Sequence, residues 1–496
     1  MHSGSGQRVI IVGAGPAGVF TALRLAATGG FQVTIMDKGR DLSHRSCPSI
    51  ERNAGCVNCP TCSVISGWGG AGAFSDGKLT LSPEIGGHLG EYVGQEKLAG
   101  LLEEADRIYL QFGAPPRVYG EVTPEVEELI RKARMADLTM IPTRIRHLGT
   151  GYSKQVLAAM ESHLRQLGVD IRMGVEVESI LSRPAEGHGG SGPAKDAGQV
   201  PAEEVWGVRT AKGEEVPADY VVVAPGREGA EWLRGEAERL KIPLATNPVD
   251  IGVRVETAAE VLEHITSKVY EAKLIFYSKT FEDKVRTFCM CPHGEVVTEN
   301  LDGLITVNGH SHAEIKTENT NFALLVSKTF TQPFKDPITY GKHIAGLANL
   351  LGGGVLVQRL GDLLTGHRST EERIHKGTIR PTLHDATPGD LSLVLPYRYL
   401  QALVEMLQAL DRIAPGIYSR NTLLYGVEVK FYSSRLQLSA ELETPVRNLF
   451  ATGDGAGVTR GLMQASASGL VVAEAIRKRA ALALLPAACG HSRDRQ

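Results

Sequence analysis

The 496-residue sequence has no uninterrupted apolar stretch approaching the roughly 18 residues that a membrane-spanning helix needs. It also lacks an excess of one charge, since 53 basic and 56 acidic residues give a net charge of −3. Neither nucleic acid nor an anionic membrane is therefore expected as a general partner. The short polar start leads directly into a strand-like run, so we expect no signal peptide. Seven cysteines, four of them crowded together, favour a reduced cytoplasmic compartment over a disulfide framework.

What the chain does contain, near its start, is a glycine-rich turn between two apolar runs. Residues 8–12 form a β-branched run that leads into Gly-Ala-Gly-Pro-Ala-Gly at 13–18. A helical pattern follows, and a second apolar run at 33–36 ends on Asp37. This order is typical of the β-α-β unit that binds adenine dinucleotides. The alternative is a glycine-rich turn in an unrelated α/β protein.

Each glycine of this turn has a physical role in the prediction. Gly13 makes the tight turn, Gly15 lets the backbone approach a pyrophosphate, and Gly18 lets helix and strand pack closely. The N-terminus of the helix offers free N–H groups and the positive end of its dipole to the phosphates. Asp37 is expected to accept hydrogen bonds from a ribose diol. The neighbouring residues Pro16, Ala17 and Lys38 complete the cofactor-binding residues predicted here.

A chain of this length exceeds what one hydrophobic core usually organises, so we expect two or three domains. An amphipathic helix is predicted over 151–168, and β-rich runs over 174–181, 205–210 and 215–223. The Gly-, Ala- and Pro-rich stretch 184–201 predicts a mobile hairpin loop. A further strand and turn are predicted over 448–455, before a helix over about 462–480.

The spacing of three motifs resembles the FAD-binding domain of the glutathione-reductase-like flavoprotein superfamily. The motifs are the turn at 13–18, Ala224-Pro225-Gly226, and Thr452-Gly453-Asp454. The resemblance implies an α/β fold: a three-layer, Rossmann-like FAD-binding domain assembled from residues 1–80, 150–235 and 440–480. It further implies a mostly helical insertion over 81–149 and an inserted α+β substrate domain over 236–439.

Within that superfamily the chain looks closest to bacterial predicted FAD-dependent dehydrogenases. The segments that carry this likeness are 67–78, 286–289, 308–311 and 424–428, which spread over nearly the whole chain. The resemblance implies an FAD-dependent oxidoreductase that exchanges a hydride between flavin N5 and a small organic substrate. The substrate, the direction of the reaction and the oligomeric state do not follow from the sequence.

The resemblance also implies where the flavin is held. Asp454 would bond the ribitol or the pyrophosphate, although a turn aspartate is the alternative. The first turn of the last helix, at Gly461, Leu462 and Met463, would direct backbone N–H groups toward the N1–C2=O edge of the ring. The glycine-dense segment 67–77 is expected to lie against the cofactor through Gly69, Gly70 and Gly72, with a mobile surface loop as the alternative. Ala224 and Gly226 belong to the second motif.

Four cysteines on one short stretch form a second candidate site. Cys47, Cys56, Cys59 and Cys62 have a spacing that can supply four thiolates to an iron–sulfur cluster or to zinc. A redox-active thiol pair and incidental free cysteines remain open, because the run lacks a second C-x-x-C pair. An iron–sulfur or thiol-linked electron carrier is accordingly one alternative function. A non-catalytic escort protein with a flavoprotein fold is another.

The catalytic residue is not identified by the sequence. Lys78, His310, Lys430 and Tyr432 are candidates for anchoring a substrate or moving a proton, although each is as readily a structural polar residue. A second, nicotinamide-binding G-x-G-x-x-G after a central strand is absent, which argues against a separate nicotinamide domain. Electrons are therefore expected from NAD(P)H bound transiently, from a redox partner protein, or through the cysteine loop.

Overall fold

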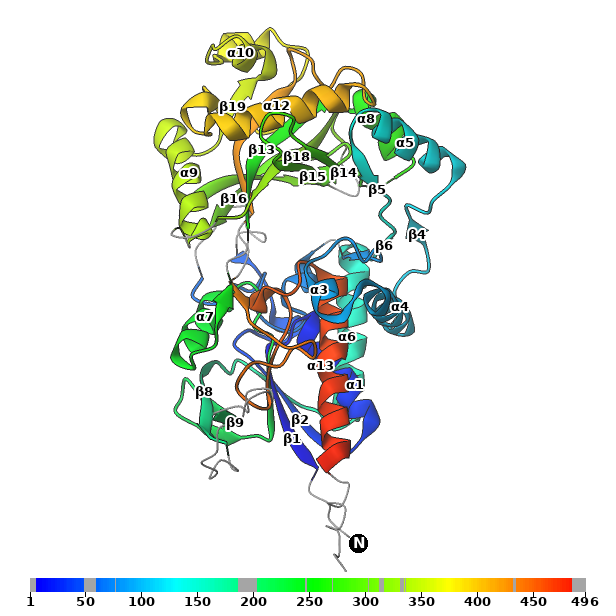
Figure 1. Ribbon diagram of the computed structural model, residues 1–496, viewed down its shortest axis with the longest axis vertical. Helices are drawn as coiled ribbons and strands as arrows, with labels where there is room; N and C mark the ends of the chain where they lie inside the picture. Colours follow the sequence, from blue (N-terminus) through cyan, green and yellow to red (C-terminus); the bar gives the residue numbers. More distant parts are fainter. Residues whose placement is uncertain are drawn as a thin grey trace, which may run out of the picture. The chain divides into compact units, whose positions relative to one another are not determined.

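The computed structural model describes residues 6–48, 59–75, 77–185, 203–245, 248–269, 271–301, 303–311, 316–330, 334, 336–430 and 434–483. The chain forms two compact units (Figure 1), each built from segments that are distant in sequence. The first unit comprises residues 1–116, 147–245 and 433–496, and the second comprises 117–146 and 246–432. No helix within the described ranges combines the length and the apolar character that crossing a membrane requires.

A five-stranded parallel sheet forms the centre of the first unit. Its order is β23-β11-β1-β2-β7, with β1 (Gln7–Val12) between β2 (Phe31–Asp37) and β11 (Tyr220–Val223). The four residues of β11 are all buried. Such continuous apolar runs are expected where a parallel sheet is covered on both faces.

This sheet is the middle one of three layers. Helices α1 (Pro16–Thr28), α6 (Gly149–Gln166) and α13 (Leu462–Ala483) lie on one side of it, and the antiparallel sheet β10-β9-β8 lies on the other (Figure 1). Helices α1 and α13 lie side by side, since Thr21 Oγ1 donates to Gly469 O at 3.1 Å. A Cβ on Gly469 would stand 2.2 Å from Ala17 O, so the two backbones touch. The predicted α/β class with a parallel, Rossmann-like sheet is confirmed.

The remaining elements of the first unit connect these layers. They are η1 (Leu42–His44), η2 (Gly70–Phe74), β3 (Lys78–Thr80), α3 (Leu89–Val93), α4 (Gln95–Gln111), β7 (Asp170–Met173), β8 (Val177–Pro184), β9 (Glu203–Thr210), β10 (Glu215–Pro217), α7 (Ala230–Arg239), β12 (Leu244–Ala245), β22 (Arg435–Leu436), β23 (Leu449–Ala451) and η4 (Asp454–Ala456).

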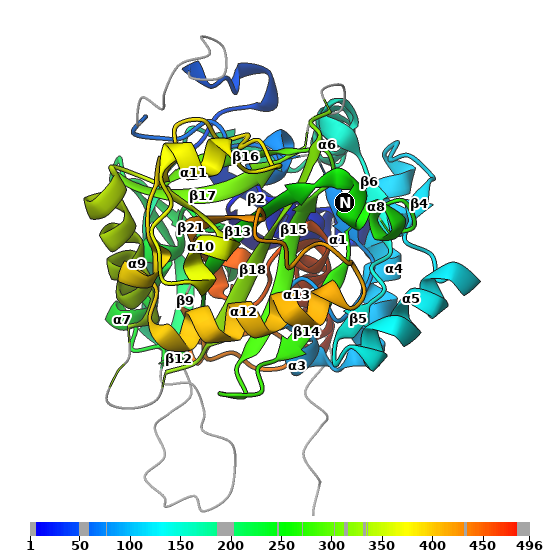
Figure 2. The same ribbon diagram turned by 90° about the horizontal axis from the view of Figure 1, so that it is seen from above.

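A largely antiparallel eight-stranded sheet organises the second unit, in the order β20-β19-β21-β13-β18-β15-β14-β5. Its central strands are β13 (Val249–Ala258), β18 (Asn319–Lys328) and β21 (Leu423–Lys430). Helix α12 (Tyr397–Asp411) crosses one face of the sheet over β13 and β18 (Figure 2). Its buried residues, among them Leu403, Met406 and Leu410, share one core with that sheet.

The other elements of this unit are the remaining strands of the sheet and the strands and helices around it. They are β4 (Val118–Tyr119), α5 (Pro124–Met135), β5 (Thr139–Ile141), β6 (Ile145–His147), α8 (Ala259–Thr266), β14 (Lys273–Tyr277), β15 (Lys284–Cys291), β16 (Glu295–Leu301), β17 (Leu304–His310), α9 (Pro337–Gly352), β19 (Leu356–Arg359), α10 (Leu360–Leu364), α11 (Glu371–His375), β20 (Thr387–Pro388) and η3 (Leu391–Leu393).

A buried ionic cluster ties α10 and α11 to the edge of this sheet. The carboxylate of Asp362 accepts hydrogen bonds from Arg359 Nη2 at 2.9 Å, Arg373 Nη1 at 2.7 Å and Ser369 Oγ at 2.7 Å. Burial acts to raise the pKa of Asp362, but these donors outweigh it and hold the pKa at about 2.

Two predicted elements differ from the structure. The run 215–223, predicted as one strand, is divided into β10 and β11, which belong to different sheets. The run predicted over 174–181 begins instead at Val177 and ends at Pro184. The predicted helices at 151–168 and 462–480 are confirmed as α6 and α13. Of the loop predicted over 184–201, residues 186–201 lie outside the described ranges.

Candidate functional site

The first glycine of the fingerprint closes the turn between β1 and α1. Gly13 has a φ of +111°, and its N–H donates to Met36 O at 2.8 Å. A Cβ at this position would stand 2.1 Å from Ala224 O. Position 13 therefore requires glycine, both because its φ is positive and because its backbone touches the 224–226 turn.

The other two glycines of the turn have opposite surroundings. A Cβ on Gly18 would meet Gly13 O at 2.0 Å, so this glycine lets α1 pack against its own strand. Gly15 has no atom within 4 Å of the place where a Cβ would stand. It is the N-cap of α1 and is followed by Pro16 in the first turn. The start of α1 therefore has open space in front of its backbone, as a pyrophosphate site requires.

The carboxylate of Asp37 is anchored to the same turn. Its Oδ2 accepts from Ala14 N at 2.9 Å, and its Oδ1 accepts from Gly39 N at 2.7 Å. Each carboxylate oxygen can accept a further bond, so these contacts fix the side chain and still leave it able to bind a hydroxyl. The adjacent Lys38 lies 3.4 Å from Glu228 Oε1, in an ion pair at the surface.

The glycine-dense segment lies against the fingerprint turn. Gly69 N donates to Ala14 O at 2.8 Å, and a Cβ on Gly70 would stand 3.1 Å from Gly15 Cα. A Cβ on Gly72 would meet Leu462 Cδ2, at the start of α13, at 2.9 Å. The segment therefore connects the first and last motifs of the chain.

The turn that begins with the third motif, at 452–454, contacts the start of α13, helix α1 and the turn at 224–226. Asp454 Oδ1 accepts from Thr459 Oγ1 at 2.7 Å and from Gly461 N at 3.2 Å, so the side chain fixes the entry to α13. A Cβ on Gly453 would stand 3.2 Å from Ala17 Cβ. The turns containing Gly226 and Gly455 also touch, because a Cβ on Gly455 would meet Gly226 O at 2.3 Å.

These contacts place the first turns of two helices beside each other. Ala17 of α1, Ala224 of the second motif and Ala465 of α13 form one small buried cluster. Met463 is buried beside it, and a Cβ on Gly461, like one on Gly15, would meet no atom within 4 Å. Helix N-termini attract negative charge through their unpaired N–H groups and their dipoles. The residues present therefore fit FAD, with its pyrophosphate and the electron-rich edge of its ring.

Arg45, which the sequence did not single out, holds the chain that leads into the glycine-dense segment. Arg45 is 5% exposed and donates to three carbonyls, those of Ser63 at 2.9 Å, Val64 at 2.9 Å and Trp68 at 2.5 Å. Its guanidinium carbon also lies 5.0 Å from the ring centroid of Phe74. Burial lowers the pKa of Arg45 to about 10, which leaves it charged at neutral pH. Arg45 thereby fixes the path of the chain into the glycine-dense segment.

The cysteine site is only partly described. Cys47 and Cys62 are half-buried and Cys59 is exposed, whereas Cys56 lies outside the described residues. Among the residues with a described placement, no group of three or more His, Cys, Asp or Glu side chains is arranged to hold a metal ion. The iron–sulfur or zinc site therefore stays a prediction.

In the second unit, the candidate Lys430 belongs to a buried ionic network. Its Nζ lies 3.3 Å from Glu428 Oε1 and 3.4 Å from Glu299 Oε2. Burial lowers the pKa of Lys430, but these two carboxylates raise it by more, so the ammonium group stays protonated at neutral pH. A permanently protonated lysine can hold an anion but cannot accept a proton.

Arg254 lies at the centre of that network and is fully buried. It donates from Nε to Asn321 Oδ1 at 2.8 Å and from Nη2 to Cys289 O at 2.6 Å, and its Nη1 lies 3.4 Å from Glu428. Burial lowers the pKa of Arg254, but the carboxylate of Glu428 outweighs it, and the net shift is upward. Burial raises the pKa of Glu428 despite the neighbouring Lys430 and Arg254.

The other catalytic candidates belong to other elements or lie outside the described residues. His310 is exposed at the end of β17, with its backbone paired to Glu295. Lys78 is half-buried at the start of β3, in the first unit. Tyr432 lies outside the described residues.

A parallel sheet with a glycine-rich turn beside two helix N-termini is typical of proteins that bind a dinucleotide. Comparison with protein families agrees. Residues 7–233 match the FAD binding domain family, and residues 248–431 match the family described as FAD-dependent protein, C-terminal domain-like. The chain is therefore similar to FAD-binding and FAD-dependent proteins over two successive ranges.

A similar full-length sequence is an uncharacterized protein of Clostridium beijerinckii. It is 28% identical over 498 residues, which cover 95% of this chain and 80% of that protein. Among solved structures, L-proline dehydrogenase from P. horikoshii has a TM-score of 0.39 at 12% identity and covers 96% of this chain and 94% of its own. Glycine oxidase from Geobacillus kaustophilus has a TM-score of 0.36 at 14% identity and covers 95% of each chain. Scores this low assign neither a reaction nor a substrate.

Proposed function

We propose that this protein is an FAD-dependent oxidoreductase that exchanges a hydride between flavin N5 and a small organic substrate. The observation that carries the proposal is that three distant chain segments contact the turn and first helical residues 13–17, in which Gly15 is open. The family match over residues 7–233 supports FAD as the dinucleotide. When bound, the flavin supplies the redox chemistry, and the protein supplies placement and electrostatics.

The residues of the first unit divide the binding of FAD between them. The open start of α1 at Gly15 receives the pyrophosphate, and Asp37, fixed by two backbone N–H groups, accepts from the ribose. Asp454 holds Gly461 at the entry to α13. The first turn of α13 would direct its N–H groups toward the ring edge that gains charge on reduction. A helix end oriented in advance stabilises that charge without rearranging.

Two of the buried cations described above, Arg45 and Lys430, serve different purposes in this proposal. Arg45 holds the backbone of the glycine-dense segment, which forms one wall of the flavin site. Lys430 stays protonated, so its use in a reaction is limited to holding a negative charge. We accordingly expect the proton acceptor for the substrate to be a group other than Lys430.

The test is the spectrum of the purified full-length protein. We expect a yellow protein whose flavin absorbance is bleached anaerobically by dithionite, and by NAD(P)H if a nicotinamide serves as reductant. A colourless protein without measurable affinity for added FAD would contradict the proposal and favour an escort role. Iron with acid-labile sulfide in the same preparation would instead support an electron carrier.

A further inference from the structure

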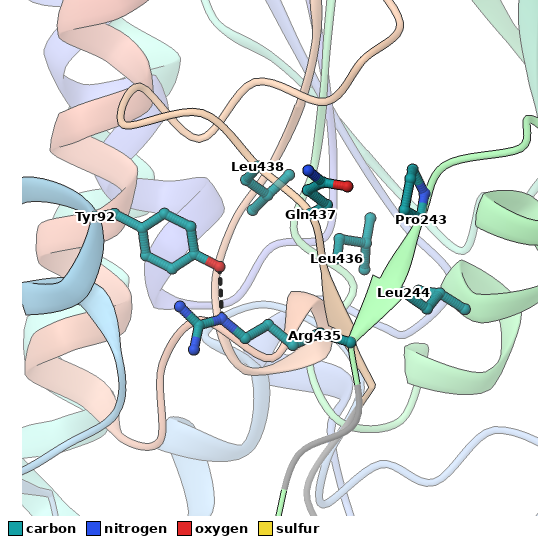
Figure 3. Close-up of a pocket in the computed structure, with 8 residues that line it drawn as sticks. Tyr92, Pro243, Leu244, Arg435, Leu436, Gln437 and Leu438 are labelled. Carbon is teal, nitrogen blue, oxygen red and sulfur yellow. Dashed lines mark hydrogen bonds between the residues drawn. The ribbon is translucent and has the colours of Figure 1, made fainter. Parts of the chain in front are cut away.

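One surface pocket of the first unit combines a fixed cation with apolar walls. It has a volume of about 280 Å³ and lies where β12 pairs with β22. Its apolar walls include Pro243, Leu244, Leu436 and Leu438, and Arg435 is its positively charged group. Figure 3 shows the guanidinium on the side of Tyr92, with Leu244 and Pro243 on the opposite side of the pocket.

The guanidinium of Arg435 is held in one orientation. Its Nε donates to Tyr92 OH at 2.7 Å, and its Nη1 donates to Glu91 Oε2 at 2.7 Å. The guanidinium carbon also lies 4.7 Å from the Tyr92 ring centroid. These bonds leave Nη2 without an acceptor among the residues that the structure describes. Because the side chain is already ordered, a ligand that binds Nη2 does not pay the entropy of fixing it.

The charge around the pocket favours an anion. Glu91 is shared, since its Oε1 accepts from His88 Nδ1 at 2.7 Å, and the other ring nitrogen of His88 accepts from Arg460 at 3.0 Å. Burial lowers the pKa of His88, so the imidazole is neutral at pH 7. Arg435 and Arg460 therefore lie on either side of the His88–Glu91 pair, and Arg435 is the cation that lines the pocket.

The same contacts connect the pocket to the cofactor site. A Cβ on Gly457, at the end of η4, would stand 2.8 Å from Arg435 Cα. His88 N donates to Val458 O at 2.8 Å, only a few residues before Gly461 and α13. The pocket therefore shares its supporting backbone with the turn that contains Asp454.

We propose that this pocket binds the carboxylate of a small aliphatic acid, with the carboxylate on Arg435 and the hydrocarbon against the leucines. The Nη2 group of Arg435 can donate a charge-assisted hydrogen bond to a carboxylate oxygen. A pocket of this volume is at the small end of ligand sites, which fits an acid of a few carbon atoms. The further step, that such an acid is the class of substrate oxidised or reduced, rests on the proposed function.

The test is calorimetric titration of the full-length, FAD-treated protein with isovalerate, isovaleramide and inorganic phosphate. We expect isovalerate to bind, and the amide and phosphate to bind at least tenfold more weakly. Arg435→Met is expected to weaken isovalerate about 10- to 100-fold, the range for losing a hydrogen bond to a charged group. The matched control is Arg209→Met, which removes a surface arginine paired with Glu215 and should leave binding unchanged.

Two further variants keep the test decisive if Arg435→Met does not fold. Arg435→Lys retains the charge but not the guanidinium held by Tyr92 and Glu91, and its affinity for isovalerate should lie between those of wild type and Arg435→Met. Tyr92→Phe removes only the acceptor of Nε and should weaken isovalerate by a few-fold. Equal binding of acid and amide, binding unaffected by every Arg435 variant, or phosphate binding as tight as isovalerate would overturn the proposal. If isovalerate binding depends on Arg435 while the protein holds no FAD, the proposed function fails and the pocket assignment stands.

Discussion

Replacing Gly15 by valine separates binding of the cofactor from folding of the domain. The φ of Gly15 is −78°, which any residue adopts, and no atom lies within 4 Å of the new Cβ. Valine is a poorer N-cap than glycine, at a cost of about 1 kcal/mol. The apo protein should therefore unfold only about 2–4 °C lower than wild type. The valine methyl groups, however, occupy the space in which the backbone approaches the pyrophosphate.

The assay compares the thermal midpoint with and without added FAD. A ligand present at about 100 times its Kd stabilises the native state by about 2.7 kcal/mol. Wild-type protein should gain that stabilisation, and Gly15→Val should gain none. The ratio of flavin to protein after gel filtration provides a second reading, which should fall from about one toward zero.

The matched control is Gly100→Val. Gly100 is an exposed glycine in α4 of the same unit, and it too has nothing within 4 Å of its Cβ position. This variant should keep its flavin and its response to FAD. If Gly15→Val retains stoichiometric flavin, the pyrophosphate does not lie at the start of α1 and our placement of the cofactor is refuted.

Three other substitutions test the surroundings of the sites. Gly18→Ala should cost about 3 kcal/mol in urea denaturation, because its Cβ would stand 2.0 Å from Gly13 O; an unchanged midpoint would show that this packing relaxes easily. Arg45→Met leaves three backbone carbonyls without their donor and should cost at least about 3 kcal/mol, with loss of bound flavin read by absorbance. Because the pKa of Asp362 in the native state is lowered to about 2, its contribution to the free energy of unfolding is present above pH 4 and is lost as pH falls toward 2. The free energy of unfolding, measured between pH 4 and pH 2, should fall by about 2 kcal/mol, and Asp362→Asn should abolish that loss.

The cofactor cradle could be predicted because its demands are local. A tight turn, a close backbone approach and a helix packed on its strand each require a glycine, and the spacing between them is fixed by the length of one turn. Gly13 and Gly18 meet these steric demands in the structure, and Gly15 has the open space that the prediction needs. The later motifs at 224–226 and 452–454 could be added because short turns at strand ends are also local patterns.

Arg45 could not be predicted in the same way. Its partners are backbone carbonyls 18 to 23 residues further along the chain, and any sequence offers such carbonyls. The division of 215–223 into two strands did leave a signal that we did not use. Pro217 cannot donate to a ladder and belongs at the end of a strand rather than within a central one. In the structure it ends β10, and Asp219 then accepts from Arg8 N at 2.7 Å where β11 begins.

The segments that carry the family resemblance in the second unit meet at one buried cation. The carbonyl of Cys289 accepts from Arg254, and the φ of +45° at Cys289 turns that carbonyl toward the guanidinium. Gly309 lies so close that a Cβ would stand 1.8 Å from Arg254 Nη2. Glu428, from a third segment, supplies the compensating charge. A buried guanidinium that lost one of these partners would cost several kcal/mol. Such residues are therefore restricted by packing and charge, whatever the substrate, so a resemblance in these segments indicates a shared fold before it indicates a shared reaction.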